Sequence, residues 1–478
     1  MKYAILFISL LVVFLYSCSG PRISVEFERL LENGDTHYTI NKVFDLKGKE
    51  ILIPKNVTLE FGRGKIINGT LVGQNTTITN VKSNQLAVEI KGTWVSTKIE
   101  DTYFNRDVLS DDQILSSINN LMSDVVANTV IINRNYAGKI TAERRYLLAP
   151  SSNSVIILKG TLSLVPNNLK AYEIIDIRNK SNIAIKGGII KGDVGKHKYI
   201  LGSTSEWGMG LSISQGQHIL IDDMLITLCT GDGIYIGGGN EVHLGEAKNA
   251  SKDITIRGVK CDGNRRQGLS VIHVDGLLVE KCKFVNTGAI ETTPPSSGID
   301  LEPNVANGRN NCIKNVIIRN CEIRNSKGRS FEADLSVING GINNYENVLI
   351  ENLITDGQFR IGANNCTFQG CKMESIQFRL FESPVSIILN NCEISGKNGI
   401  SFLPNHKHDY YYKSSETERK FKSVIFNNCK IKLFPTASKT VRPVVDYTDD
   451  VVEYIEFNNC SIITKGIIES KSRAFFNK

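Results

Sequence analysis

The 478-residue sequence has few prolines, few tryptophans and no basic tract. It contains 11 Pro against 40 Gly and only 2 Trp, a balance that suits strands and turns better than helices. The formal net charge is +7, but the positive residues are not gathered together, which argues against a dedicated nucleic-acid-binding protein. With 41% hydrophobic and 22% charged residues, the chain is also not disordered, collagen-like or a polytopic membrane protein. An acidic polymer is compatible with the mildly basic charge.

Only one hydrophobic run is long, and it covers residues 3–16. Its position and length are those of an export signal, and no later stretch is apolar enough to cross a membrane. The run ends in Leu-Tyr-Ser-Cys, which resembles the bacterial lipobox. We therefore expect a signal peptide over 1–17, lipidation of Cys18 and a tether over 18–25, with acyl chains holding an exported lipoprotein on the outer membrane or cell surface. An ordinary cleaved signal with an incidental Cys is the alternative.

The other ten cysteines contain no Cys-x-x-Cys pair. Most follow a short β-branched run and precede one polar and then one apolar residue. With Met, Val and Leu at equivalent places, the register is 224, 259, 282, 321, 353, 371, 392, 429 and 460. Repeats of roughly 20–40 residues are typical of a solenoid, and alternating runs separated by Asn- and Gly-containing turns predict strands. The stacked cysteines are therefore interpreted as core packing in a parallel β-helix, in preference to metal or redox sites.

A second strand in each coil can be aligned independently of the first. Its apolar members point inward and the residues between them point outward. The alignment predicts an exposed row, which we call the site row: Ser212, Tyr235, Ser270, Asp300, Glu332, Arg360, Gln377 and Ser401. One pleat along the same face, Glu302, Asp334 and Arg379 form a second row.

The remaining segments complete the expected organisation. Strand-like pieces over 26–105 indicate opening coils or a small N-terminal β cap. A helix near 110–122 begins with an N-cap pattern and would cover the open end of the stack. The parallel β-helix itself is expected over 106–478, with a polar, aromatic loop inserted over 404–421.

Carboxylates gather on the outward face. Adjacent coils lie about 4.8 Å apart, so Asp300 and Glu332 should face each other, with Glu302 and Asp334 beside them. Such a patch should keep at least one proton near neutrality, and a protonated acid beside an ionised carboxylate is what glycoside hydrolysis needs. Asp300 and Glu302 are the expected acid/base and nucleophile or water-activating pair, with Glu332 and Asp334 modulating them. A solvated acidic face or a Ca²⁺ site is the alternative.

Residues beside this patch would bind the sugar. Arg265 and Arg266 would clamp a uronate or sulfate, or neutralise the sugar carboxylate in a lyase, and Gln267 enters the same strand. Trp207, next to Glu206, would offer a stacking surface for a sugar ring. Structural salt bridges and a packing role for the tryptophan are the alternatives.

Four further residues complete the candidate set. His197 and His273 are acid/base or binding candidates, although each suits an ordinary hydrogen-bonding role as well. Asp232 is a further catalytic candidate or a turn residue. Tyr235, on the site row, would help to position the sugar.

Residues 192–335 carry a family resemblance. With Gly231-Asp232-Gly233, Asn264-Arg265-Arg266-Gln267-Gly268 and Gly298-Ile299-Asp300-Leu301-Glu302, the chain resembles right-handed parallel β-helix proteins of the pectate-lyase superfamily. That superfamily includes polygalacturonases, pectate lyases, alginate epimerases and phage tailspikes, and the motif set is similar to one in surface lipoproteins of Bacteroidetes. Asp232 matches the Asp of the polygalacturonase Asn-Thr-Asp-Gly motif. However, Gln267-Gly268 stands where that family has an Asp-Asp pair, and the epimerase Asp-Pro-His-Glu motif is missing. The resemblance therefore implies an all-β, right-handed parallel β-helix and carbohydrate chemistry without transferring a mechanism.

Together these features favour a surface glycoside hydrolase acting on a polysaccharide, acidic polymers included. A polysaccharide lyase or epimerase with an Arg or His base is the second reading, and a non-catalytic glycan-binding protein is the third. No cofactor is expected apart from the Ca²⁺ alternative, nor a nucleic-acid partner. A monomer is the simplest expectation, with the oligomeric state left open.

Overall fold

The computed structural model describes residues 37–237, 249–303, 311–333, 345–363, 365–379, 386–403, 423–433, 445–446, 455–463 and 474–477. The signal peptide, the tether, Cys18, Asp334 and the loop at 404–421 lie outside these ranges. Within them, no helix is long and apolar enough to span a membrane.

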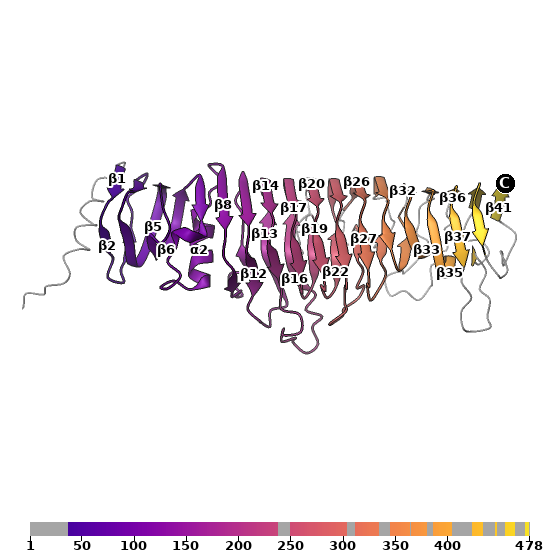
Figure 1. Cartoon of the computed structure of the whole chain (residues 1–478), viewed down its shortest axis with the longest axis horizontal. Coiled ribbons are helices and arrows are strands. Elements are labelled where there is room, and N and C mark those ends of the chain that lie inside the picture. The colour runs from indigo at the N-terminus through magenta and orange to yellow at the C-terminus, as the bar shows by residue number, and fades with distance from the viewer. Residues whose placement is uncertain are drawn as a thin grey trace, which may run out of the picture.

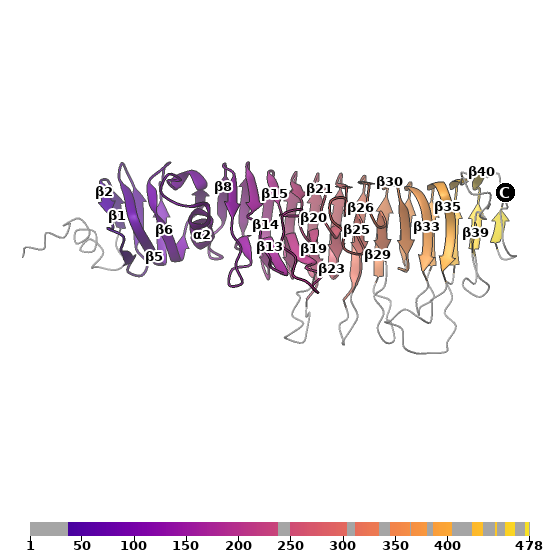
Figure 2. The same cartoon turned by 90° about the horizontal axis from the view of Figure 1, so that it is seen from below.

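The strands wind into an elongated solenoid (Figures 1 and 2). The described strands pair in parallel and stack into long ladders, with an N-terminal sheet and one helix before them. Parallel strands require crossover connections. Here the chain passes through the other ladders of the same coil before it returns to the next strand of a ladder. The expected fold class, an all-β right-handed parallel β-helix with an N-terminal β/helix cap, is confirmed.

Three ladders and the N-terminal sheet contain all the named strands. The 14-stranded ladder comprises β7 (Lys98–Glu100), β8 (Asn128–Ile132), β11 (Ser154–Leu158), β14 (Ser181–Lys186), β17 (Gln217–Asp222), β20 (Ser251–Arg257), β23 (Val274–Glu280), β26 (Ile313–Arg319), β29 (Tyr345–Glu351), β32 (Cys366–Gln369), β34 (Ser386–Asn390), β36 (Ser423–Asn427), β39 (Ile455–Asn458) and β41 (Ala474–Asn477). The short-strand ladder comprises β9 (Tyr136–Gly138), β12 (Thr161–Leu164), β15 (Ile189–Lys191), β18 (Leu225–Thr227), β21 (Lys260–Asp262), β24 (Lys283–Val285), β27 (Glu322–Arg324), β30 (Ile354–Thr355), β37 (Lys430–Leu433) and β40 (Ser461–Ile463). The site ladder comprises β10 (Tyr146–Leu148), β13 (Ala171–Arg178), β16 (Trp207–Ser214), β19 (Asp232–Gly237), β22 (Gln267–Val271), β25 (Ile299–Leu301), β28 (Phe331–Ala333), β31 (Gln358–Ile361), β33 (Lys372–Arg379), β35 (Glu393–Leu403) and β38 (Val445–Asp446). The N-terminal sheet comprises β1 (His37–Ile40), β2 (Val43–Asp45), β3 (Glu50–Leu52), β4 (Thr58–Phe61), β5 (Lys65–Thr79) and β6 (Leu86–Val95), and a 3₁₀ turn, η1 (Asp101–Tyr103), follows it.

The cysteine register marks one corner of the coil. The residue before each corner position is held in the left-handed backbone region, as at Asn320, Asn352 and Asn391. Asn tolerates this conformation better than most residues, which explains the repeated Asn before Cys. The corners stack through backbone bonds and through side chains, with Asn352 Nδ2 donating to Asn320 Oδ1 at 3.1 Å. The ten described cysteines carry free thiols, eight of them buried, so the stack is core packing.

Replacing Asn352 by Ala should lower the free energy of unfolding by about 1 kcal/mol, because Ala lacks the short polar side chain that makes a φ of 50° tolerable and the bond to Asn320 is lost. The Asn352→Gly variant loses the same bond without the Cβ strain and should cost less. Urea unfolding followed by circular dichroism would measure both changes. Equal costs would show that the left-handed backbone does not explain the asparagine.

The single α-helix of the described residues is α2 (Asp111–Leu121). Ser110 caps it: Gln113 N donates to Ser110 Oγ at 3.3 Å, and Ser110 N donates to Gln113 Oε1 at 3.0 Å. We expected the helix over an open end of the stack, but it lies between β6 and the first strands of the main ladders (Figure 1). The helix therefore fills the junction between the N-terminal sheet and the main ladders.

Polar side chains of α2 pair with backbone groups on both of its neighbours. On the β6 side, Ile90 N donates to Ser117 Oγ at 3.0 Å, and Asn120 Nδ2 donates to Ile90 O at 2.8 Å. On the β9 side, Asp111 accepts a 2.8 Å bond from Ala137 N. Because the last strand of a sheet leaves backbone groups unpaired, these bonds explain why the helix stands at the junction.

The register of the site ladder confirms the predicted site row. Asp300 stands opposite Ser270 on one side and Glu332 on the other, and Glu332 stands opposite Arg360. The predicted exposure of the row is wrong in its central part, since Asp300 is only 2% exposed and Tyr235 is also buried. Asp300 is held there by a hydrogen bond from Gln267.

Candidate functional site

A network of charged groups surrounds Arg266 where the chain enters β22. Arg266 Nη1 lies 3.1 Å from Asp232 Oδ2 and 2.8 Å from Gln267 Oε1. Gln267 Nε2 in turn donates to Asp300 Oδ2. We call Asp232, Arg266, Gln267, Asp300 and Glu302 the Arg266 network. It brings together three of the predicted catalytic carboxyls and two of the predicted binding residues.

One guanidinium in this network faces four carboxyl groups. Burial lowers the pKa of Arg266, but nearby carboxylate charges raise it by more than burial lowers it, so the net shift is upward. These charges belong to Asp232, Asp300, Glu302 and Glu206. The cation is therefore permanent, and the excess of carboxyls over cations favours retention of protons among them.

Two of these carboxyls hold their protons more tightly than usual. Burial raises the pKa of Asp232 to about 7, while Arg266 lowers it and the charges of Glu206 and Glu302 raise it. Burial also raises the pKa of Glu302, opposed by Arg266 and supported by Glu332 and Glu206. Asp232 therefore gains and loses its proton near neutral pH, the property that an acid or a base in a catalytic site needs.

Replacing Asp232 by Asn should flatten the pH dependence of stability. The folded protein holds this proton up to about pH 7 and the unfolded chain only to about its ordinary pKa of 3.8. The free energy of unfolding should therefore fall as pH rises across that window, by about 1.4 kcal/mol per pH unit at most, and then level off. Urea unfolding at pH 5 and pH 8 would compare the two proteins. Parallel profiles would contradict the assignment.

Glu332 is held by cations and by a hydroxyl. Ser297 Oγ donates to its Oε1 at 2.6 Å, and the Nη1 atoms of Arg329 and Arg360 lie 3.4 and 3.2 Å from its two oxygens. Glu332 is therefore held in place between two guanidiniums and a hydroxyl, beside Asp300. Asp334, expected next to it, lies outside the described residues.

The predicted sugar-stacking residue Trp207 begins β16 and is 39% exposed. Glu206 before it is partly buried and acts electrostatically on Asp232 and Arg266. Tyr235, by contrast, is buried in the middle of the site row, so it offers a sugar little surface.

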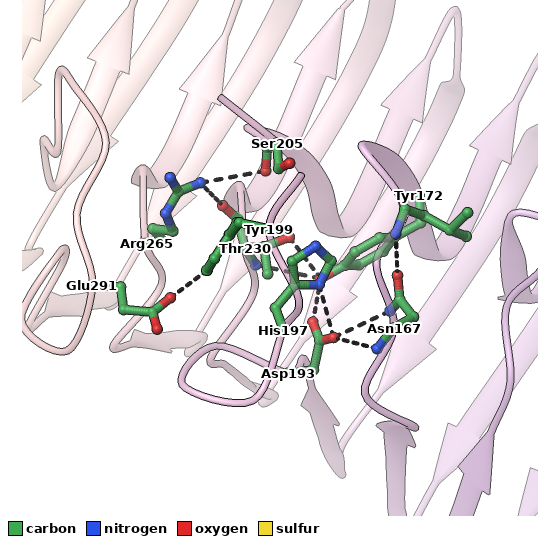
Figure 3. Close-up of polar contacts among 10 residues, drawn as sticks. Asn167, Tyr172, Asp193, His197, Tyr199, Ser205, Thr230, Arg265 and Glu291 are labelled. Atoms are coloured by element: carbon green, nitrogen blue, oxygen red, sulfur yellow. Dashed lines mark hydrogen bonds and ion pairs between the residues drawn. The ribbon is translucent and has the colours of Figure 1, made fainter. Parts of the chain in front are cut away.

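Arg265 and His197 belong to a different cluster (Figure 3). His197 Nδ1 lies 2.9 Å from Asp193 Oδ2, with both side chains fully buried. Arg265 Nη1 donates to the Thr204 carbonyl at 2.8 Å, and its guanidinium lies 4.5 Å from the ring centroid of Tyr199. The predictions that place Arg265 on a substrate carboxylate and His197 in acid/base work are thus not supported by the geometry, because both side chains fasten a loop.

Asp193 is the centre of that cluster. It accepts bonds from Asn167 N at 3.0 Å and from the Tyr172 hydroxyl at 3.0 Å, besides its contact with His197. Tyr199 on the same loop donates to Glu291 on a loop three coils later. We call the segment 192–206 the clamp loop. It leads directly into Trp207, so the cluster sets the position of the edge of the site.

His273 also lies apart from the Arg266 network. Its Nδ1 accepts a 2.9 Å bond from Cys312 N, and burial lowers its pKa. The imidazole is therefore neutral near pH 7 and joins two coils just before β23 and β26. Its role as a substrate-binding residue stays a prediction.

Sequence reasoning missed a second pair of carboxyls on the site ladder. Asp176 stands opposite Ser212, so it extends the site row by one coil. Burial and the charge of Asp176 raise the pKa of Glu173 to about 7, and Arg178 lies within 3.8 Å of both carboxyls. Aligning Ile-Asp-Ile of β13 with Leu-Ser-Ile of β16 would have found this extension.

The described residues contain no group of three or more His, Cys, Asp or Glu side chains arranged to hold a metal ion. In the Arg266 network, Asp232 bonds to a guanidinium and Asp300 bonds to an amide.

No protein-family model matches the chain. The SPbeta prophage-derived uncharacterized protein YorA of Bacillus subtilis strain 168 is 34% identical over 165 residues, covering 33% of this chain and 28% of that protein. The uncharacterized protein YclG of the same organism is 31% identical over 163 residues, covering 31% and 28%. Each alignment thus spans less than a third of the relative's length.

Among solved structures, two forms of the tailspike protein of Escherichia coli bacteriophage HK620 in complex with a pentasaccharide are similar to this chain. A double mutant has a TM-score of 0.51 at 12% identity and covers 76% of this chain and 67% of its own. A single mutant has a TM-score of 0.51 at 13% identity with the same coverage. This chain therefore shares the parallel β-helix fold of those tailspikes.

Proposed function

We propose that this protein hydrolyses glycosidic bonds of a polysaccharide at the Arg266 network. The observation that carries the proposal is a carboxyl with a raised pKa that lies two residues from a second, hydrogen-bonded carboxyl. Glu302 has a raised pKa, whereas Asp300 accepts a bond from Gln267 beside a permanent cation. A protonated acid and an ionised carboxylate on one face are the two groups that glycoside hydrolysis requires.

The roles follow from the surroundings of each group. Glu302, partly buried with a raised pKa, is the proton donor to the leaving oxygen. Asp300 is the nucleophile or the base that activates water, and Arg266 stabilises its charge. Trp207 supplies an exposed ring on which a sugar can stack.

Hydrolysis is favoured over elimination because the bases considered for a lyase are engaged elsewhere. Arg265 donates to loop carbonyls, His197 is buried against Asp193, and His273 accepts from Cys312. The tailspike fold gives this reading a precedent, since the similar HK620 proteins bind a pentasaccharide.

Glycan binding without turnover is the second candidate. The observation in its favour is the burial of the row, with Asp300 only 2% exposed and Glu332 only 3% exposed. A binder would use the exposed Trp207 and the charged groups of the row without bringing a glycosidic oxygen to Asp300.

Turnover by the full chain on polygalacturonate, alginate, chondroitin sulfate, xylan and dextran tests the proposal. Hydrolysis creates new reducing ends without ultraviolet absorbance, because no double bond forms. Absorbance appearing with the reducing ends would replace the hydrolase with a lyase. Gel retardation with no change in polymer length would favour the binding protein.

The lipobox-like sequence at residues 15–18 supports a second proposal, that acyl chains on Cys18 anchor the protein to a membrane surface. Radiolabelled palmitate should enter the wild-type chain in a bacterial host and be lost in Cys18→Ser. Equal labelling of both chains would reject the anchor.

A further inference from the structure

The balance of charge reverses between the Arg266 network and the next coils of the site ladder. In the network, one guanidinium faces four carboxyl groups. One coil further, the single carboxylate of Glu332 faces two guanidiniums, with Arg329 Nη1 at 3.4 Å and Arg360 Nη1 at 3.2 Å. Counted over the described residues alone, the local sum is one net positive charge, next to a site rich in carboxyls.

The two cations are more accessible than the anion between them. The side chains of Arg329 and Arg360 are 28% and 17% exposed, whereas that of Glu332 is 4% exposed. A polymer lying along the ladder would therefore meet the guanidiniums before the carboxylate. Arg360 stands opposite Glu332, which stands opposite Asp300, so it lies two rungs, or about 10 Å, from the proposed catalytic carboxyl.

Two polar atoms beside Glu332 and Arg360 lack a hydrogen-bond partner among the described residues. The Nε–H of Arg329 and the Oε1 of Gln377 are buried and have no partner among the described residues. Gln377 stands opposite Arg360 on the next rung. Because buried polar groups are rarely left unpaired, a donor and an acceptor here suit a ligand with both an anionic group and hydroxyls.

We propose that Arg329, Arg360 and Gln377 form a subsite for an acidic sugar unit, one whose carboxylate or ester sulfate binds between the two guanidiniums. The inference deepens the proposed function and rests on it for the polymer. Planar guanidiniums match the geometry of carboxylate and sulfate groups. This assignment differs from the prediction that Arg265 and Arg266 bind the acidic group of the sugar. Arg265 bonds a loop carbonyl instead, and Arg266 bonds Asp232.

Binding measured without turnover tests the subsite. Affinity gel electrophoresis of the full chain carrying Asp300→Asn would use polygalacturonate for the carboxylate, dextran sulfate for the sulfate and dextran as the uncharged polymer. We expect retardation by polygalacturonate or dextran sulfate and none by dextran. Adding Arg329→Gln and Arg360→Gln should weaken that binding about tenfold or more. Arg178→Gln, at an exposed arginine of the same ladder, should change it little.

A variant with the opposite expected effect separates recognition from folding. Glu332→Gln keeps the side-chain shape and raises the local charge, so it should strengthen binding of the anionic polymer, whereas a purely structural role would weaken it. Weaker or unchanged binding by Glu332→Gln, equal retardation by dextran, no retardation by either anionic polymer, or no loss on removing the arginines would each overturn the inference. If the wild-type chain shows this binding pattern but no hydrolysis, the proposed function fails and the subsite stands.

Discussion

Replacing Asp300 by Asn should lower kcat/KM on a hydrolysed polysaccharide by about a thousandfold. The change removes the carboxylate that attacks the sugar or activates water. Groups in acid/base roles contribute about 10²–10⁴ in rate. Asn keeps the size of the side chain and an acceptor oxygen for Gln267 Nε2, so the fold should persist. Reducing-end release under saturating and limiting substrate would measure kcat and KM separately.

A matched control comes from the opposite side of the coil. Asp222 ends β17 on the 14-stranded ladder and is bonded to Arg257 at 2.9 Å. Asp222→Asn makes the same chemical change away from the site ladder and should leave kcat/KM within about twofold, as surface substitutions usually do. Turnover by Asp300→Asn equal to this control would remove Asp300 from the mechanism while leaving the fold unaffected.

Replacing Asp193 by Ala should give the largest loss of stability, about 3–5 kcal/mol. Four groups would lose their acceptor: the Asn167 backbone N–H, the Asn167 side-chain amide, the Tyr172 hydroxyl and the ring of His197. Each buried polar group left unpaired costs about 1–3 kcal/mol. The clamp loop would also be released, so KM for the polymer should rise through displacement of Trp207. Urea unfolding and steady-state kinetics would measure the two effects.

The conservative change distinguishes hydrogen bonding from packing. Asp193→Asn fills the same volume and keeps one acceptor oxygen, but it replaces the other oxygen by an amide N–H, which points at the donor or donors that the oxygen served. It should therefore cost clearly less than Asp193→Ala. Equal losses would indicate that volume, not the hydrogen bonds of Figure 3, holds the clamp loop.

The stacking order of the coils was predictable because the strands repeat. Residues one coil apart occupy equivalent places in short alternating strands, so the row from Ser212 to Ser401 could be aligned without tertiary information. The corner Asn residues could be aligned for the same reason, because they recur directly before the corner residue. In the structure they occupy the left-handed backbone region. Periodic patterns therefore predicted the ladders, their register and the face that carries the polar residues.

The partner of each polar group was not predictable in the same way. Arg265 and Arg266 are adjacent, yet one bonds the carbonyls of the clamp loop and the other bonds Asp232. Both arginines lie in the bend before β22, and the partner that each meets depends on loops that carry no repeat. The contact of Tyr199 with Glu291, 92 residues apart, shows how far such loops reach.

The coil, its register and the outward-facing carboxyls could thus be predicted from the sequence, because these depend on local alternation repeated along the chain. The folded chain was needed to see that the row is largely buried, that His197 and Arg265 fasten a loop, and that Arg329 and Arg360 flank Glu332. Exposure and pairing depend on which segments meet across coils. The free energy of a buried charge is set by those neighbours rather than by its position in a strand.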